Sequence, residues 1–84
     1  DLLAYRIIKY LDEAGFAVPE QIGVVGYDNL QIGTLSGITI TTVGYDFNRL
    51  ARRTLETLSE NIRTRQAARP VVIPSHVIIR NSTP

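Results

Sequence analysis

The chain has 84 residues, which is enough for one small domain at most. Apolar residues make up 44% and charged residues 20%, as in ordinary soluble globular domains, and no run approaches the roughly 18 apolar residues of a membrane span. The absence of cysteine excludes a disulfide framework and a thiolate metal site, and it fits a reducing cytosol. Because the sequence begins at Asp1 and contains no methionine, we expect it to be part of a longer protein.

The net charge of +1 is unevenly distributed along the chain. Residues 1–46 carry two basic and six acidic residues, a net charge of −4, and residues 47–84 carry seven arginines and two glutamates, a net charge of +5. This asymmetry fits either a polyanionic partner or an arginine-rich, solvated helix face. The second interpretation is favoured, because no basic tract is interleaved with aromatic residues as on a nucleic-acid surface.

The first half of the chain predicts a helix followed by a buried strand. Apolar residues recur at spacings of three and four over residues 2–14, which predicts a helix with Asp1 as its N-cap and Gly15 just past its end. The almost wholly apolar run from Ile22 to Tyr27 is typical of a parallel strand buried on both faces. A helix, a short loop and a buried strand together favour an α/β layered sheet.

A second strand and a long helix follow. Residues 30–37 predict a loop with a helical turn, and the alternation over residues 38–43 predicts a strand. The apolar spacing from Phe47 to about Arg65 predicts an amphipathic helix, with Asp46 as its cap. Residues 71–73 and 76–80 predict β segments interrupted by Pro74, and residues 81–84 a tail.

The joint between the second strand and the long helix combines a glycine, two aromatic residues and an acid. Gly44, Tyr45, Asp46 and Phe47 can bend, stack on a flat ring and accept hydrogen bonds, which are the properties of a hinge in a ligand cleft. Any strand-to-helix turn has the same properties, and packing of Tyr45 and Phe47 in a core is the leading alternative.

Residues for catalysis, metal binding or cofactor binding are not recognisable. The single histidine, His76, lies in an alternating strand, and the sequence contains no G-x-S-x-G elbow, phosphate-binding loop or cluster of metal ligands. We therefore predict no enzyme activity, no catalytic residues, no metal and no cofactor. Recognition of a small molecule remains, with Asp1 and Asp46 as acceptors and Tyr45 and Phe47 as apolar walls.

Four motifs resemble a known family. They are D-L-L-A at residues 1–4, V-P-E-Q-I-G-V-V-G-Y-D at 18–28, T-T-V at 41–43 and P-S-H-V-I-I-R-N-S-T at 74–83. In this order and spacing the chain resembles the C-terminal part of the effector-binding core of the lactose-repressor (LacI/GalR) family of bacterial transcription regulators. The resemblance covers nearly all 84 residues, and the run at 18–28 is its most specific part.

The resemblance implies a type I periplasmic-binding-protein-like α/β fold, with a parallel sheet flanked by helices and an effector between two subdomains. Residues 1–44 and about 71–84 would belong to the C-terminal subdomain. Residues from about 45 to 70 would form a helix and crossover of the N-terminal subdomain. The DNA-binding headpiece is not among these residues.

The resemblance also implies roles for single residues. Asp1 matches the family's acid that hydrogen-bonds the effector, and Tyr45, Phe47 and Leu50 match pocket positions. Tyr45 stands where some members have glutamine, so the effector need not be a lactose-like sugar. The hinge would comprise Gly44, Tyr45 and Asp46. The loop after the G-Y-D motif would contribute to a dimer interface, for which the candidates are Leu30, Leu35 and Ser36.

The function implied is that of the effector-sensing part of a cytoplasmic transcriptional repressor. A sugar or related metabolite would bind, and operator DNA would be contacted by a homodimer through the missing headpiece, without any membrane partner. The main alternative is a periplasmic sugar-binding protein of an ABC transporter. An upstream helix-turn-helix would indicate the repressor, and a signal peptide the transporter component. An α/β enzyme would need a catalytic cluster outside these residues.

Overall fold

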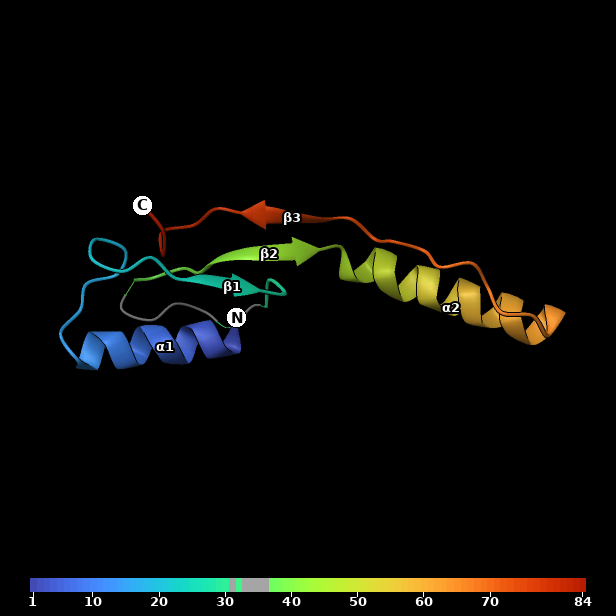
Figure 1. Cartoon of the computed structure of the whole chain (residues 1–84), viewed down its shortest axis with the longest axis horizontal. Coiled ribbons are helices and arrows are strands. Elements are labelled where there is room, and N and C mark those ends of the chain that lie inside the picture. The colour runs from blue at the N-terminus through green and yellow to red at the C-terminus, as the bar shows by residue number, and fades with distance from the viewer. Residues whose placement is uncertain (31, 33–36) are drawn as a thin grey trace. The chain divides into compact units, whose positions relative to one another are not determined.

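The computed structural model describes residues 1–30, 32 and 37–84. Along the chain the elements are α1 (Leu2–Glu13), β1 (Val25–Tyr27), β2 (Thr41–Tyr45), α2 (Phe47–Thr64) and β3 (Ser75–Ile78) (Figure 1). The chain divides into two compact units. The first consists of Asp1–Gly44 and His76–Pro84, and the second of Tyr45–Ser75.

Helix α1 ends as the sequence pattern predicts. It buries Ala4 and Ile8, one turn apart on the same face. Beyond its last turn, Gly15 has the left-handed φ of 84° that its position after the helix predicts. The amide of Gly15 donates to Asp12, at 3.1 Å, and that of Phe16 to Leu11, at 2.9 Å, so two terminal carbonyls are satisfied in a Schellman motif.

The sheet of the first unit confirms the predicted α/β fold. Strands β1 and β2 are parallel, with Val25 opposite Thr41 and Tyr27 opposite Val43. Strand β3, whose first residue belongs to the second unit, lies on the other side of β2 and runs in the opposite direction (Figure 1). The parallel pair therefore has an antiparallel neighbour, as is common in mixed sheets.

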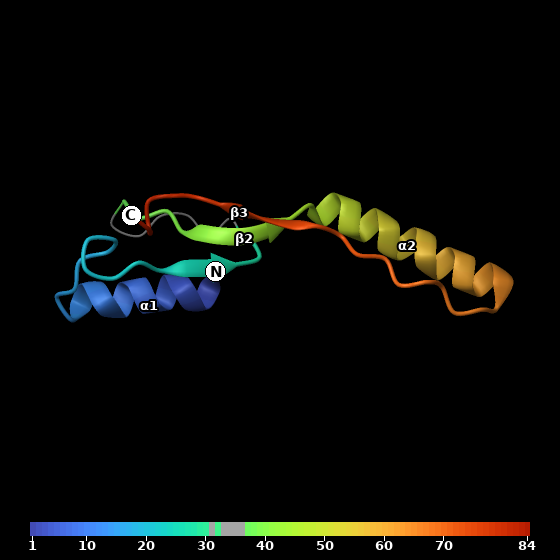
Figure 2. The ribbon, with the colours of Figure 1, turned by 45° about the horizontal axis from the view of Figure 1, so that its top comes forward.

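The core of the first unit lies between α1 and the sheet. Among the described residues, its buried apolar members are Ala4, Ile8, Val24 and Ile40. Helix α1 runs alongside β1 in both ribbon views (Figure 1 and Figure 2). Burial on both faces of the first strand, however, is a wrong prediction. Val25 and Tyr27 are 57% and 52% exposed, because no described element of this unit covers their side of β1.

The predicted C-terminal tail is instead bonded into the first unit. Ser82 is fully buried: its hydroxyl donates to the carbonyl of Val24 at 2.6 Å and accepts from the amide of Thr41 at 2.7 Å. The side chain of Asn81 accepts from the amide of Thr39 at 2.6 Å. The chain end therefore joins the segments that lead into β1 and β2, which explains why a polar sequence is ordered here.

Strand β2 begins three residues later than the alternation predicts and continues through Gly44 and Tyr45. The joint therefore narrows to Asp46, the single residue between β2 and α2. Among the later β segments only Ser75–Ile78 forms a strand, and residues 71–73 do not. The proline before Ser75 fits this limit, since it cannot donate to a strand ladder.

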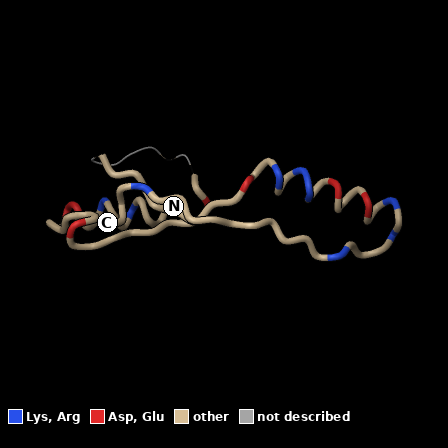
Figure 3. The backbone as a smooth tube through the Cα atoms, turned by 90° about the horizontal axis from the view of Figure 1, so that it is seen from above, with Lys and Arg blue, Asp and Glu red and all other residues tan. Residues whose placement is uncertain are grey.

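Helix α2 belongs to the second unit. The Asp46 carboxylate accepts from the amide of Arg49 at 2.9 Å, which confirms the predicted cap. Basic and acidic residues follow one another along the helix (Figure 3). Ion pairs join Arg53 to Glu56 and Arg63 to Glu60, each pair three residues apart along the helix.

The apolar stripe of α2 is not covered within its own unit. The stripe residues are 37% to 69% exposed, and α2 has no buried residue. They are Phe47, Leu50, Leu55, Leu58 and Ile62. An amphipathic helix is stabilised chiefly by burying such a face, so the exposed stripe is a candidate contact surface.

Candidate functional site

The Asp1 carboxylate lies against the sheet of the first unit. Its Oδ1 accepts from the hydroxyl of Thr42 at 2.5 Å, and its Oδ2 accepts from the amide of Leu30 at 2.7 Å. The backbone nitrogen of Asp1 donates to the carbonyl of Tyr27 at 2.8 Å. The carboxylate makes no capping hydrogen bond to the first turn of α1, so the predicted role as a side-chain N-cap is wrong. Donors from the turn after β1 and from β2 hold the carboxylate instead.

Gly26 makes room for this carboxylate. A Cβ atom at this position would overlap Oδ1 of Asp1 and lie 3.0 Å from Cγ2 of Ile40. Contacts under 3.0 Å do not occur for real Cβ atoms without a shift of the neighbour. The glycine of the G-Y-D motif therefore allows the acid before α1 to lie directly across β1.

The turn after β1 is connected to β2 and to the C-terminal segment. Asp28 and Asn29 have positive φ angles of 91° and 53°, which Asp and Asn tolerate better than other residues. The amide of Asn29 donates to the hydroxyl of Thr42 at 3.3 Å. Its side-chain oxygen accepts from Nη2 of Arg80 at 2.7 Å, while Nη1 of Arg80 donates to the carbonyl of Ile40 at 2.9 Å.

Gly44, a predicted hinge residue, is the last residue of the first unit before the chain enters the second. It is buried, and a Cβ atom there would lie 2.8 Å from Cβ of Asn29 and 3.0 Å from Cδ1 of Ile78. A larger residue would therefore displace the turn after β1 or β3. Close packing therefore explains the glycine at position 44 without any bending of a hinge.

The second unit contains the other predicted contact residues. The rings of Tyr45 and Phe47 have centroids 4.9 Å apart and an interplanar angle of 59°, within the range of favourable aromatic pairs. Phe47 is exposed, and Tyr45 is partly buried at the end of β2. The two predicted aromatic residues therefore lie together, and Asp46 between them in the sequence is bonded to the amide of Arg49.

The motifs and the α/β fold point to one protein family. The sequence profile described as "Periplasmic binding protein-like domain" matches residues 1–83 of the chain. The chain belongs to this family.

Relatives of this periplasmic binding protein-like chain include transcriptional repressors. It is 30% identical to the HTH-type transcriptional repressor PurR of Photobacterium profundum and 32% identical to that of Mannheimia succiniciproducens, each over 83 residues. Each alignment covers 98% of this chain and 25% of the relative, so the chain spans about a quarter of the length of these curated relatives. The matches confirm the resemblance to LacI/GalR regulators. No solved structure matches the chain.

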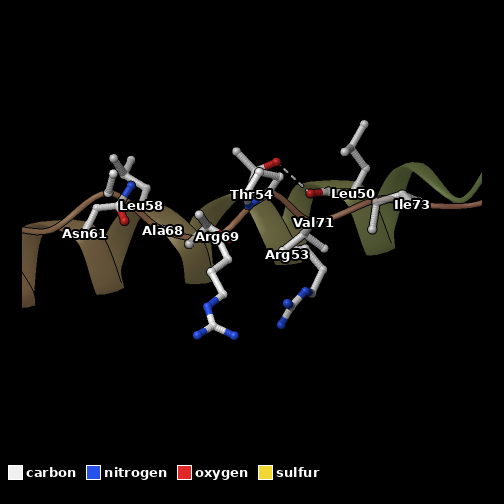
Figure 4. A pocket seen from close by; sticks show the side chains of 12 residues that line it. Leu50, Arg53, Thr54, Leu58, Asn61, Ala68, Arg69, Val71 and Ile73 are labelled. Carbon is white, nitrogen blue, oxygen red and sulfur yellow. Dashed lines mark hydrogen bonds between the residues drawn. The ribbon is translucent and has the colours of Figure 1, made fainter.

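The periplasmic binding protein-like chain has a groove within its second unit, between α2 and the segment that returns from it. Its volume is about 490 Å³, and its apolar lining includes Leu50, Leu58 and Val71 (Figure 4). Oδ1 of Asn61 is buried there and accepts no hydrogen bond from the described residues. Leu50 lines this groove, whereas Tyr45 and Phe47 are not among its lining residues. The structure therefore does not bring the predicted Leu50 together with the aromatic pair in this groove.

The predicted dimer-interface residues are only partly described. Leu30 is exposed, and its amide is bonded to Asp1, whereas Leu35 and Ser36 lie outside the described residues.

Neither helix of the described residues has the length and apolar character that crossing a membrane needs. The sequence patterns did not indicate roles for Gly26, Thr42 and Arg80, although the G-Y-D, T-T-V and R-N-S-T motifs contain these residues.

Proposed function

We propose that the chain is the effector-sensing part of a bacterial transcriptional repressor. The observation that carries this proposal is the similarity over 98% of the chain to HTH-type transcriptional repressors, together with membership of the periplasmic binding protein-like family. A small molecule would bind one conformation of the domain more tightly than another and so shift the affinity for operator DNA. Such coupling requires unequal affinity of the effector for the two states.

Asp1 is the proposed polar contact to the effector. A carboxylate offers about four acceptor positions, and the described hydrogen bonds from Thr42 and Leu30 use two of them. The oxygens are held at two points and the residue is only partly buried, so its orientation is fixed while solvent reaches it. These properties suit recognition of hydroxyl or N–H donors on a ligand.

Tyr45, Phe47 and Leu50 are the proposed apolar contacts. The exposed ring of Phe47, supported by the ring of Tyr45, offers a surface on which a sugar or a flat heterocycle can stack. Together with a hydrogen-bond acceptor, this composition favours a sugar or related metabolite with ring and donor groups. Gly44, Tyr45 and Asp46 are proposed as a hinge, because the chain passes from one compact unit to the other between Gly44 and Tyr45.

The two compact units correspond, in this proposal, to pieces of the family's two subdomains. Residues 1–44 and about 71–84 would belong to the C-terminal subdomain, and about 45–70 to the N-terminal subdomain with the effector cleft between them. The exposed stripe of α2 supports this assignment, since it would be covered by protein beyond the second unit, and the relatives are about four times longer than this chain. The intact protein would be a cytoplasmic homodimer that contacts DNA through a separate headpiece.

A ligand screen on the intact parent protein tests the effector part of the proposal. Calorimetry would compare sugars and purine bases for binding to the wild type and to Asp1→Asn, which keeps the side-chain shape but loses the charge. We expect at least one compound to bind and the substitution to weaken it by on the order of 1–3 kcal/mol. An unchanged affinity in the variant would remove Asp1 from the site.

A further inference from the structure

The guanidinium of Arg80 connects the turn after β1 to Ile40, the residue directly before β2. Its Nη2 donates to Oδ1 of Asn29 at 2.7 Å, and its Nη1 donates to the carbonyl of Ile40 at 2.9 Å. The backbone amide of Arg80 adds a bond to the hydroxyl of Thr41 at 2.9 Å. Because the donors of a guanidinium have a rigid planar arrangement, two acceptors on different segments fix the spacing between those segments.

Both donors that hold the Asp1 carboxylate depend on this spacing. Leu30, whose amide binds Oδ2, directly follows Asn29 in the turn. Thr42, whose hydroxyl binds Oδ1, lies in β2 and also accepts from the amide of Asn29. A displacement of Asn29 would therefore move one donor directly and remove a bond from the other.

The side chain of Asn29 is enclosed between two neighbours. Arg80 binds its oxygen, and Gly44 lies so close that an added Cβ would be 2.8 Å from Cβ of Asn29. The left-handed φ of 53° suits asparagine, so this residue supplies both the backbone conformation of the turn and an acceptor for the guanidinium. Its position thus links the C-terminal segment and the end of β2 to the Asp1 carboxylate.

We propose that Arg80 and Asn29 are positioning residues, which orient the Asp1 carboxylate for its ligand without contacting the ligand themselves. The ligand part of this inference rests on the proposed function, whereas the positioning is a property of the domain without ligand. Arg80 and Asn29 are not among the proposed effector contacts, so their role is separate from those contacts.

Hydrogen exchange at the amide of Leu30, measured by NMR in the intact protein without ligand, tests the positioning. Asn29→Gly keeps the left-handed turn but removes the acceptor of Arg80, whereas Asn29→Asp keeps an acceptor. Asn81→Ala is the matched control, since it removes hydrogen bonds to Thr39 and Gly37 in the same unit without touching the Asp1 network. Urea unfolding of each variant supplies the global stability.

We expect Asn29→Gly to accelerate Leu30 exchange by about five- to ten-fold relative to the other protected amides of β1 and β2. Asn29→Asp and Asn81→Ala should leave this ratio within about two-fold. Arg80→Lys, which retains one donor group, should accelerate the exchange less than Asn29→Gly does. If Asn29→Gly does not fold, Arg80→Lys takes its place in the test. An unchanged ratio in Asn29→Gly or Arg80→Lys, or an equal change in Asn81→Ala, would overturn the inference. The experiment uses no ligand, so its result can be interpreted even if Asp1 does not contact the effector.

Discussion

The hydroxyl of Thr42 donates to Oδ1 of Asp1 at 2.5 Å, while Thr42 itself is fully buried in β2. A residue before the first helix is thereby fixed by a residue 41 positions later in the chain. The same hydroxyl accepts from the amide of Asn29, so a single side chain serves both the carboxylate and the turn after β1.

Thr42→Val should destabilise the intact protein by about 1–3 kcal/mol. The substitution preserves the shape of the side chain but leaves the Asn29 amide and one oxygen of Asp1 without this partner. Urea unfolding measures the loss. Thr42→Ser, which keeps the hydroxyl and loses only a methyl group, should cost less, and a larger cost for serine than for valine would contradict the assignment.

Gly26→Ala should lower stability by about 1–3 kcal/mol, because the new Cβ overlaps the Asp1 carboxylate and crowds Ile40. Gly23→Ala is a matched control in the same segment, since its Cβ would meet Pro84 Cδ at an ordinary 3.6 Å. The control should stay within about 0.5 kcal/mol of the wild type. Equal free energies of unfolding for the two variants would show that the acid does not lie over Gly26.

Ser82→Ala should cost about 2 kcal/mol or more, because it leaves the carbonyl of Val24 and the amide of Thr41 buried without their partner. Ser59→Ala, on the exposed surface of α2, should have almost no effect. Thermal or urea unfolding of the intact protein compares them. A similar small effect for both serines would mean that the C-terminal segment is not bonded to β1 and β2.

Asp46→Ala should destabilise the intact protein by about 1 kcal/mol, since the carboxylate caps α2 through the amide of Arg49. Asp46→Asn should retain most of the cap, because asparagine accepts the same hydrogen bond. Measurement of the free energy of unfolding separates the two. If the asparagine variant loses as much stability as the alanine variant, the negative charge of Asp46 and not its cap hydrogen bond stabilises the helix.

Local signals in the sequence were sufficient for the helices. Apolar spacing, Gly15 after α1 and Asp46 before α2 act within one or two turns, and the structure has both helices where these signals place them. The resemblance to LacI/GalR regulators likewise correctly predicted the fold class and family. Both kinds of prediction depend on residues close together in the chain or on recognised motifs.

The partners of Asp1 and Ser82 could not be read from local patterns. The carboxylate binds groups 29 and 41 residues away, and the serine binds a carbonyl 58 residues away. Asp1 occupies an ordinary capping position, so the sequence favoured a cap, whereas the donors that hold it come from another part of the fold. The effector contacts, the hinge and the dimer residues stay predictions.

The most direct test of the repressor assignment is DNA binding by the intact parent protein. Fluorescence anisotropy with DNA from upstream of its own gene, at fixed salt because phosphate contacts make the affinity salt-dependent, would be measured with and without sugars and purine bases. We predict tight, sequence-selective binding and at least one compound that changes the affinity for DNA. Binding of a sugar without any binding of DNA would contradict it and favour a solute-binding protein of a transporter.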